Sequence, residues 1–126
     1  MKKTKLLVLG GFGFLGTNCL KFFQDKYELY ATYHHTQHDP IDNVRYLPCN
    51  LTQREEVDKL FSSIRPDLVI LAAAVTTGAK DVIEKPYLHV TDNFIINSLV
   101  LELAHVYKAK HVIFFSCSVM YKPSEL

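Results

Sequence analysis

The sequence lacks an excess of charge of either sign. Its 14 lysines and arginines stand against 13 aspartates and glutamates, so the formal net charge is +1. A chain with so little net charge has no long-range field that would draw it to nucleic acid or to an anionic membrane surface. We therefore expect no nucleic-acid partner and no membrane partner, and any bound anion must be held by local groups.

Cysteine is scarce and irregularly spaced. Cys19, Cys49 and Cys117 make an odd number with no Cys-x-x-Cys pair, which argues against a disulfide framework and against a zinc site. A reducing compartment, the cytoplasm, is the expected location.

Long apolar runs are also missing. No segment approaches the roughly 18 apolar residues of a membrane-spanning helix. The lysines at the start and the run Leu6-Leu7-Val8-Leu9 imitate a secretory signal, but glycines end the run at once and no small-residue cleavage site follows. The chain also has no repeat, linker or low-complexity tract. With 126 residues and 48% apolar content, it predicts a single domain, residues 1–126, with one sizeable core.

Short apolar runs alternate along the chain with segments of helical spacing. This pattern predicts strands over 5–9, 28–33, 44–49, 68–74 and 111–115, and helices over 14–25, 53–64 and 91–107. Segment 34–43 is predicted as a loop and 81–86 as a loop or broken helix. Thr52 and Glu55 resemble a capping box for the second helix. The alternation predicts a Rossmann-like, doubly wound parallel sheet in the order 3-2-1-4-5. Five aromatic residues are predicted to lie in its core: Phe22, Phe23, Phe94, Phe114 and Phe115.

The strongest motif is Gly10-Gly11-Phe12-Gly13-Phe14-Leu15-Gly16, which joins the first strand to the first helix. One glycine permits a tight turn, a second lets the backbone approach a diphosphate, and a third allows the helix and strand to pack closely. Gly10, Gly13 and Gly16 are spaced for these tasks, and the amino end of the helix beginning near Phe14 would face the phosphates. The alternative is a glycine turn needed only for packing.

The end of the second strand usually selects between the two nicotinamide cofactors. An acid there holds the ribose 2′-OH of NAD, and a basic residue accepts the 2′-phosphate of NADP. The residues here are Tyr33, His34 and His35, and the missing acid favours NADP slightly. These side chains pack beside the adenine or face solvent in the alternative interpretation. Together with His38 and Asp39 the histidines would suit a metal, but a solvated loop is favoured and we predict no metal.

The glycine motif resembles the GGxGFxG turn of the extended short-chain dehydrogenases, the family of nucleotide-sugar epimerases, dehydratases and reductases. Later segments also resemble that family's pattern, most closely in its GDP-fucose synthase-like and dTDP-4-dehydrorhamnose reductase-like members. The resemblance implies an adenine contact at Asn50 and Leu51, a small-residue run at Ala72, Ala73 and Ala74 beside the cofactor, and a conformation-setting Asn93. It implies cofactor contacts by Phe14 and Leu15 as well, and catalytic hydroxyls in the segment Ser116-Cys117-Ser118.

Two departures from the family pattern limit what the resemblance implies. Cys117 stands where the family has its catalytic serine or threonine, and a thiol is the poorer hydrogen-bond donor. The family's Tyr-x-x-x-Lys pair is absent, because no tyrosine here has a lysine four residues later. We therefore interpret the chain as the amino-terminal, NAD(P)-binding portion of a nucleotide-sugar epimerase, dehydratase or reductase, inactive by itself and truncated before the substrate-binding half.

The alternative is a non-catalytic module that holds a dinucleotide or associates through its sheet. The fifth strand, Val112-Ile113-Phe114-Phe115, is apolar and would leave an uncovered edge. A homo-oligomer is therefore expected.

Overall fold

A computed structural model describes residues 2–76, 79–116 and 122 of the chain. The strands are β1 (Lys5–Leu9), β2 (Glu28–Tyr33), β3 (Val44–Pro48), β4 (Leu68–Leu71) and β5 (His111–Phe114). All neighbouring strands are parallel, and their order is β3-β2-β1-β4-β5. The predicted Rossmann-like sheet and its strand order are confirmed.

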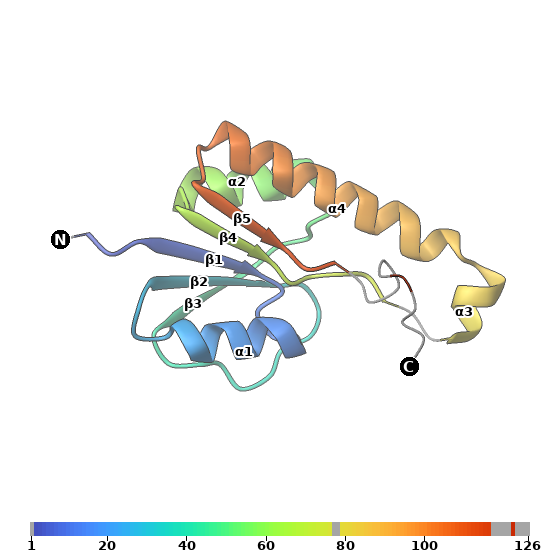
Figure 1. The fold of residues 1–126 in the computed structure, drawn as a ribbon, viewed down its shortest axis with the longest axis horizontal. Helices are drawn as coiled ribbons and strands as arrows, with labels where there is room; N and C mark the ends of the chain where they lie inside the picture. Colours follow the sequence, from blue (N-terminus) through green and yellow to red (C-terminus); the bar gives the residue numbers. More distant parts are fainter. Residues whose placement is uncertain (1, 77–78, 117–121, 123–126) are drawn as a thin grey trace.

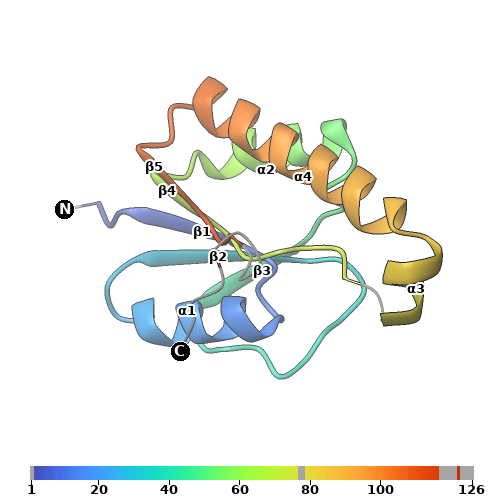
Figure 2. The same cartoon turned by 45° about the vertical axis from the view of Figure 1, so that its right-hand side comes forward.

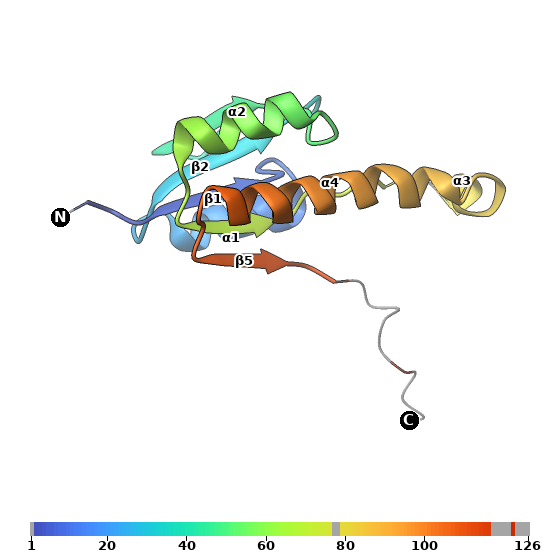
Figure 3. The ribbon, with the colours of Figure 1, turned by 90° about the horizontal axis from the view of Figure 1, so that it is seen from above.

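Helices cover both faces of this sheet. The described helices are α1 (Phe14–Phe23), α2 (Arg54–Ile64), α3 (Ala79–Glu84) and α4 (Tyr87–Val106). Helices α2 and α4 lie on one face and α1 lies on the other (Figures 1 and 3), while α3 stands beyond the carboxyl ends of the strands (Figure 2). None of the described helices is long and apolar enough to cross a membrane.

Strand β1 is buried on both faces because its apolar side chains alternate between two cores. Leu7 and Leu9 belong to the larger core, under α2 and α4, while Leu6 and Val8 belong to the smaller core, under α1. All four side chains are essentially inaccessible to solvent. Burial of each contributes about 1.5–3 kcal/mol, which explains why a continuous apolar run, rather than an alternating one, marks this strand.

The predicted element bounds need some corrections. Strand β4 ends at Leu71, so residues 72–74 lie beyond the strand, although the Ala72 N–H still donates to the Leu9 carbonyl of β1 at 2.9 Å. Helix α1 ends at Phe23, and β3 ends at Pro48. Helix α4 begins at Tyr87, earlier than predicted, because Pro86 supplies a fixed φ suited to a helix start. The short α3 and the break before α4 agree with the broken helix predicted over 81–86.

The predicted capping box is wrong. Helix α2 starts after Gln53 and has no side-chain cap. The Thr52 hydroxyl instead donates to Asn50 Oδ1 at 2.7 Å, and Glu56, not Glu55, reaches back to accept from the Asn50 N–H at 2.7 Å. Thr52 is drawn away from the helix because the Asn50 side chain, two residues before it, is the nearer partner.

The prediction of an aromatic core is also largely wrong. Phe23 packs against the smaller core, but Phe94 is 72% exposed and Phe114 is 54% exposed, and Phe22 and Phe115 are exposed too. Periodicity shows which residues share a face, but not whether another element covers that face. On the α1 side, a hollow over β4 and β5 remains open among the described residues, lined by Leu6, Phe23, Tyr27, Leu68, Ile70 and Ile113.

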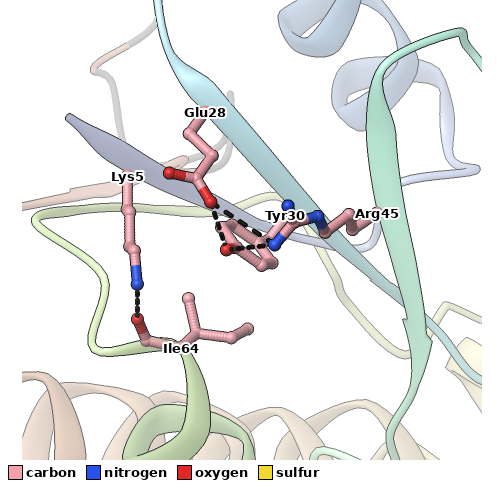
Figure 4. A network of polar contacts seen from close by, with 5 residues as sticks. All are labelled: Lys5, Glu28, Tyr30, Arg45 and Ile64. Carbon is pink, nitrogen blue, oxygen red and sulfur yellow. Dashed lines mark hydrogen bonds and ion pairs between the residues drawn. The ribbon is translucent and has the colours of Figure 1, made fainter. Parts of the chain in front are cut away.

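Polar contacts near the amino ends of the strands join β2 to the edge strand β3 and join β1 to the end of α2 (Figure 4). The Tyr30 hydroxyl donates to Glu28 Oε1, and Arg45 donates to the Tyr30 hydroxyl at 2.9 Å. The hydrogen bond from Tyr30 holds the pKa of Glu28 below its usual value, with Arg45 acting in the same direction. Lys5 Nζ donates to the Ile64 carbonyl at 2.8 Å, where α2 ends.

Asp67 closes the same end of the sheet at the start of β4. Its Oδ2 accepts from the Lys5 N–H at 2.9 Å, and its Oδ1 lies 3.1 Å from Lys110 Nζ. The Lys5 backbone hydrogen bond, assisted by Lys110, lowers the pKa of the Asp67 carboxyl. The side chain therefore links the segments that enter β1, β4 and β5.

We predict that Asp67→Asn weakens the fold at neutral pH but not in strong acid. A lowered pKa gives stability above the unfolded-state value, near pH 3.9, which is lost as pH falls through the folded-state value. Because the side chain is 31% exposed, we expect a loss of roughly 0.5–1 kcal/mol in urea unfolding at pH 7. The loss should shrink as pH falls below about 4. Exposed Asp25 provides the control Asp25→Asn; an equal effect of the two variants would contradict the assignment.

Candidate functional site

The glycine turn leaves β1 through a backbone conformation that favours glycine. Gly10 has φ of +90°, and a Cβ added there would lie 2.8 Å from the Ala73 backbone nitrogen. The turn is held by Thr32, the buried polar residue of β2. Its Oγ1 accepts from the Gly10 N–H at 3.1 Å and its carbonyl accepts from the Gly11 N–H at 2.8 Å.

Gly16 and Gly13 are glycines for different reasons. A Cβ on Gly16 would lie 1.9 Å from the Gly10 carbonyl oxygen, so only glycine lets α1 pack this closely on the turn. Gly13 is exposed, has an ordinary φ of −73°, and a Cβ there would meet only Gly10 O at 3.6 Å. Packing therefore explains Gly16 but does not explain Gly13.

The amino end of α1 offers its positive pole to solvent. The helix begins at Phe14 after Gly13, which has no side chain to cap it, and its first turn contains no acidic residue. Phe14 is exposed and Leu15 is partly so. Uncapped amide groups at a helix start attract anions, phosphates in particular.

Three adjoining hollows follow the carboxyl ends of the strands. The Gly13 hollow is lined by Gly10, Phe12, Gly13, Phe14, 32–36, His38 and 72–76. The Asn50 hollow is lined by Gly10, 32–34, 49–52, 73–75, Asp92 and Ile96. The Asn93 hollow is lined by Leu15, 71–74, Asn93, Asn97 and 114–116. All three share Ala73 and Ala74, so they form one continuous surface along this edge of the sheet.

The structure gathers the predicted site residues at these hollows. Tyr33, His34, Asn50 and Leu51 line the Asn50 hollow, and Gly10, Gly13, Phe14 and Ala72 line the Gly13 hollow. Leu15, Asn93 and Ser116 line the Asn93 hollow together with Ala73 and Ala74. Gly16 is buried behind the turn. Cys117 and Ser118 lie outside the described residues.

Asn50 keeps one side of its amide group available. Its Oδ1 accepts from both the N–H and the hydroxyl of Thr52, at 3.1 and 2.7 Å. Within the described ranges, its Nδ2 donates no hydrogen bond. A donor at this position suits the edge of a purine base.

The side-chain amide of Asn93 is engaged by backbone groups, so its polar atoms are not free to face the Asn93 hollow. Its Oδ1 accepts from the Val75 N–H at 2.7 Å, and its Nδ2 donates to the carbonyls of Val75 and His89 at 2.9 and 2.7 Å. The side chain thus fixes the 72–76 segment to α4 and has a positioning role.

Sequence reasoning missed Thr32 and an aromatic stack behind the turn. Phe12 lies parallel to Tyr46, with 4.4 Å between ring centroids and 7° between planes, and Tyr33 meets Phe12 edge-on. Neither Thr32 nor the aromatic stack belongs to a sequence motif, because each depends on contacts between strands. The spacing of aromatic residues around β2 and β3 was the only sequence signal for the stack.

The described residues give little support for thiol or metal chemistry at this edge of the sheet. Burial raises the pKa of the Cys49 thiol to about 11, so Cys49 is not an activated nucleophile. Within residues 2–76, 79–116 and 122, no three His, Cys, Asp or Glu side chains are grouped to hold a metal ion.

Together, the parallel sheet and the glycine turn at its edge define a Rossmann-like domain. The family model for the NAD dependent epimerase/dehydratase family matches residues 6–126. The chain therefore belongs to the NAD dependent epimerase/dehydratase family. Among curated protein sequences, none matches the chain.

Solved structures share this fold at low sequence identity. One UDP-glucose 4-epimerase superposes with a TM-score of 0.84 at 20% identity, covering 98% of this chain and 38% of that protein. The Thermotoga maritima UDP-glucose 4-epimerase, solved with UDP-glucose, gives 0.78 at 24% identity, covering 88% and 37%. The Bordetella bronchiseptica enzyme WbmG, solved with NAD, gives 0.79 at 17%, covering 94% and 39%. This chain thus spans well under half the length of these proteins.

We predict that Thr32→Val loosens the glycine turn. The substitution keeps the side-chain shape but leaves the Gly10 N–H without its acceptor, which should cost about 1–2 kcal/mol. Hydrogen exchange at the Gly10 amide should become faster in this variant. Thr32→Ser keeps the hydroxyl and should retain the slow exchange; equally fast exchange in both variants would contradict the role of the hydroxyl.

Proposed function

We propose that the chain binds a nicotinamide dinucleotide with its diphosphate over Gly13 and the amino end of α1. The observation that carries this proposal is Gly13 itself, which is open to the hollow although neither packing nor backbone conformation requires glycine there. Bare backbone at a helix start lets phosphate oxygens approach the amide groups. The chain can thus hold an anion despite its small net charge.

The adjoining hollows support one direction for the cofactor. The adenine would enter the Asn50 hollow, where Leu51 supplies an apolar wall and Asn50 Nδ2 a donor. The nicotinamide would extend along Ala72 and Ala73 to the Asn93 hollow, near Ser116. A nicotinamide cofactor supplies hydride transfer when it is bound. The small side chains of 72–74 permit close approach, and Asn93 keeps that segment in place.

We infer that the activity is that of an epimerase, dehydratase or reductase acting on a nucleotide sugar, to which this chain contributes the cofactor site. Similar structures were solved with UDP-glucose or with NAD, which supports both ligand classes. The segment 116–118 would contribute hydroxyls beside the reacting sugar. We further propose NADP as the preferred cofactor, because no carboxylate follows β2 among residues 34–38.

Location and assembly are also proposals. Free thiols at Cys19 and Cys49 favour a reducing compartment, the cytoplasm. Exposed Ile113 and Phe114 on β5 favour self-association. Light scattering at several protein concentrations would measure the oligomeric state.

Gly13→Ala tests the diphosphate site. The free energy of unfolding should change by about 1 kcal/mol or less, since the new methyl group has room and the backbone conformation allows alanine. Calorimetry with NADH and NADPH should show at least about tenfold weaker binding, because the methyl group would stand where phosphate must approach. Gly16→Ala should instead destabilise the fold by at least about 2 kcal/mol.

The control for this experiment is Lys21→Ala, in the last turn of the same helix. Its cofactor affinity should equal that of the unaltered protein. Unchanged affinity in Gly13→Ala would refute the position of the diphosphate. If the unaltered protein took up neither cofactor, the proposed function itself would fail.

Catalysis provides a separate test. Because no tyrosine in these 126 residues is followed by lysine four positions later, we expect the chain alone to bind cofactor but not to turn over. Oxidised NAD or NADP would be mixed with UDP-glucose, whose hydroxyl-bearing carbon can give a hydride to the cofactor, and formation of the reduced cofactor would be followed by its absorbance. Measurable reduction of the cofactor, or any conversion of the sugar, by these residues alone would contradict this expectation.

A further inference from the structure

Phe12 is the residue of the glycine turn that the backbone leaves unsupported. It stands between Gly11 and Gly13, and glycine loses more conformational freedom on ordering than any other residue. The Gly11 N–H donates to the Thr32 carbonyl at 2.8 Å, whereas the hydrogen bond from the Gly13 N–H is longer, at 3.4 Å. Within the described ranges, the backbone N–H and carbonyl of Phe12 form no hydrogen bond. The position of Phe12 therefore depends on its side chain.

The Phe12 ring is surrounded by aromatic side chains from β2, from β3 and from the loop that joins them. It lies parallel to the ring of Tyr46. Tyr33 and His38 meet it edge-on, with centroids 5.8 and 6.4 Å away. Ring pairs of these kinds add stability beyond the burial of their apolar surface. Together they hold Phe12 in the wall of the Gly13 hollow, which it lines.

Tyr46 gives the Phe12 ring a firm support because several contacts hold Tyr46 itself. Its side chain packs against the smaller core, and its hydroxyl accepts from the Ile41 N–H at 3.2 Å. A Cβ added to Gly11 would lie 3.2 Å from Cε1 of Tyr46, so this ring also lies against the backbone of the turn. One side chain of β3 therefore contacts two successive residues of the glycine turn.

The order of the turn before binding matters for the affinity of a diphosphate. A segment that becomes ordered only when the ligand binds lowers the affinity by the cost of that ordering. This cost is large where glycines flank the residue to be ordered. A ring stack that already fixes Phe12 in the free protein removes much of the cost, because the backbone N–H groups are then in place.

We propose that Tyr46 is a positioning residue, which preorganises the glycine turn for the diphosphate through its stack on Phe12. The inference rests on the proposed function, because a diphosphate over Gly13 is the ligand that needs the turn in place. Tyr46 is absent from the described lining of the Gly13, Asn50 and Asn93 hollows. It therefore acts through Phe12 rather than by contact with the cofactor.

The experiment is a double-mutant cycle read by calorimetry with NADH. Phe12→Leu and Tyr46→Leu each keep an apolar side chain but remove the stack, and each should weaken binding about fivefold. The variant with both substitutions should bind as the single variants do, because the same stack can be lost only once. Tyr46→Phe keeps the ring and should retain the affinity of the unaltered protein.

A second measurement follows the turn directly. In the free protein, ¹⁵N relaxation at the amides of Phe12 and Gly13 should give order parameters near about 0.85, falling toward about 0.6 in Phe12→Leu. Saturation with NADH should restore the higher values. The matched control is Phe22→Leu, which also loses an edge-on ring pair, with Phe23, but at an exposed position of α1. It should match the unaltered protein in affinity and in order parameters.

The outcomes separate this inference from the proposed function. Unchanged NADH affinity in Phe12→Leu, additive losses in the double variant, or unchanged order parameters would each overturn the inference, while continued binding of NADH would leave the proposed function intact. If the unaltered protein bound no NADH, both would fail. Thermal unfolding shows whether each variant is folded at the temperature of the titration. Should Tyr46→Leu not fold, Phe12→Leu and its order parameters decide alone.

Discussion

The contact between Gly16 and the carbonyl group of Gly10 sets the geometry of the whole site. An added Cβ would lie 1.9 Å from that oxygen, so α1 can approach the end of β1 only because both partners at the contact are bare backbone. Thr32 holds the other side of the turn through the Gly10 and Gly11 amides. Together the two contacts direct the start of α1 toward the Gly13 hollow, and Gly13 remains exposed at the edge of that hollow.

Much of the fold could be predicted because the apolar runs of a parallel sheet are buried on both faces. Strands β1 and β2 were predicted to the residue, and the order of the sheet follows from strand and helix alternation. The capping box failed because it was a local pattern in competition with another local pattern, the turn made by Asn50. The aromatic core failed because burial of Phe94 and Phe114 depends on what covers a face, and spacing along one helix or strand carries no information about that.

The candidate site divides in the same way. Residues on the glycine turn and at strand ends could be predicted, because the carboxyl ends of parallel strands meet at one edge. Thr32 could not be predicted, since its role depends on the backbone N–H groups of Gly10 and Gly11, which follow a different strand. The resemblance implied a conformation-setting Asn93, but its backbone partners, Val75 and His89, could not be read from the sequence. Sequence motifs identify the residues that lie at the carboxyl edge of the sheet, whereas the contacts that hold those residues in place are seen only in the tertiary structure.

The two ends of the sheet differ in how they are charged, and this difference bears on anion binding. At the amino ends, Glu28, Arg45, Asp67 and Lys110 are engaged in ion pairs. At the carboxyl ends, the Gly13 hollow has backbone amides and imidazoles but no permanent charge among its described lining residues. Among those residues, an anion would meet no carboxylate to repel it and no lysine or arginine to hold it. The uncapped amide groups at the start of α1 are then the groups on which the proposed anion binding depends.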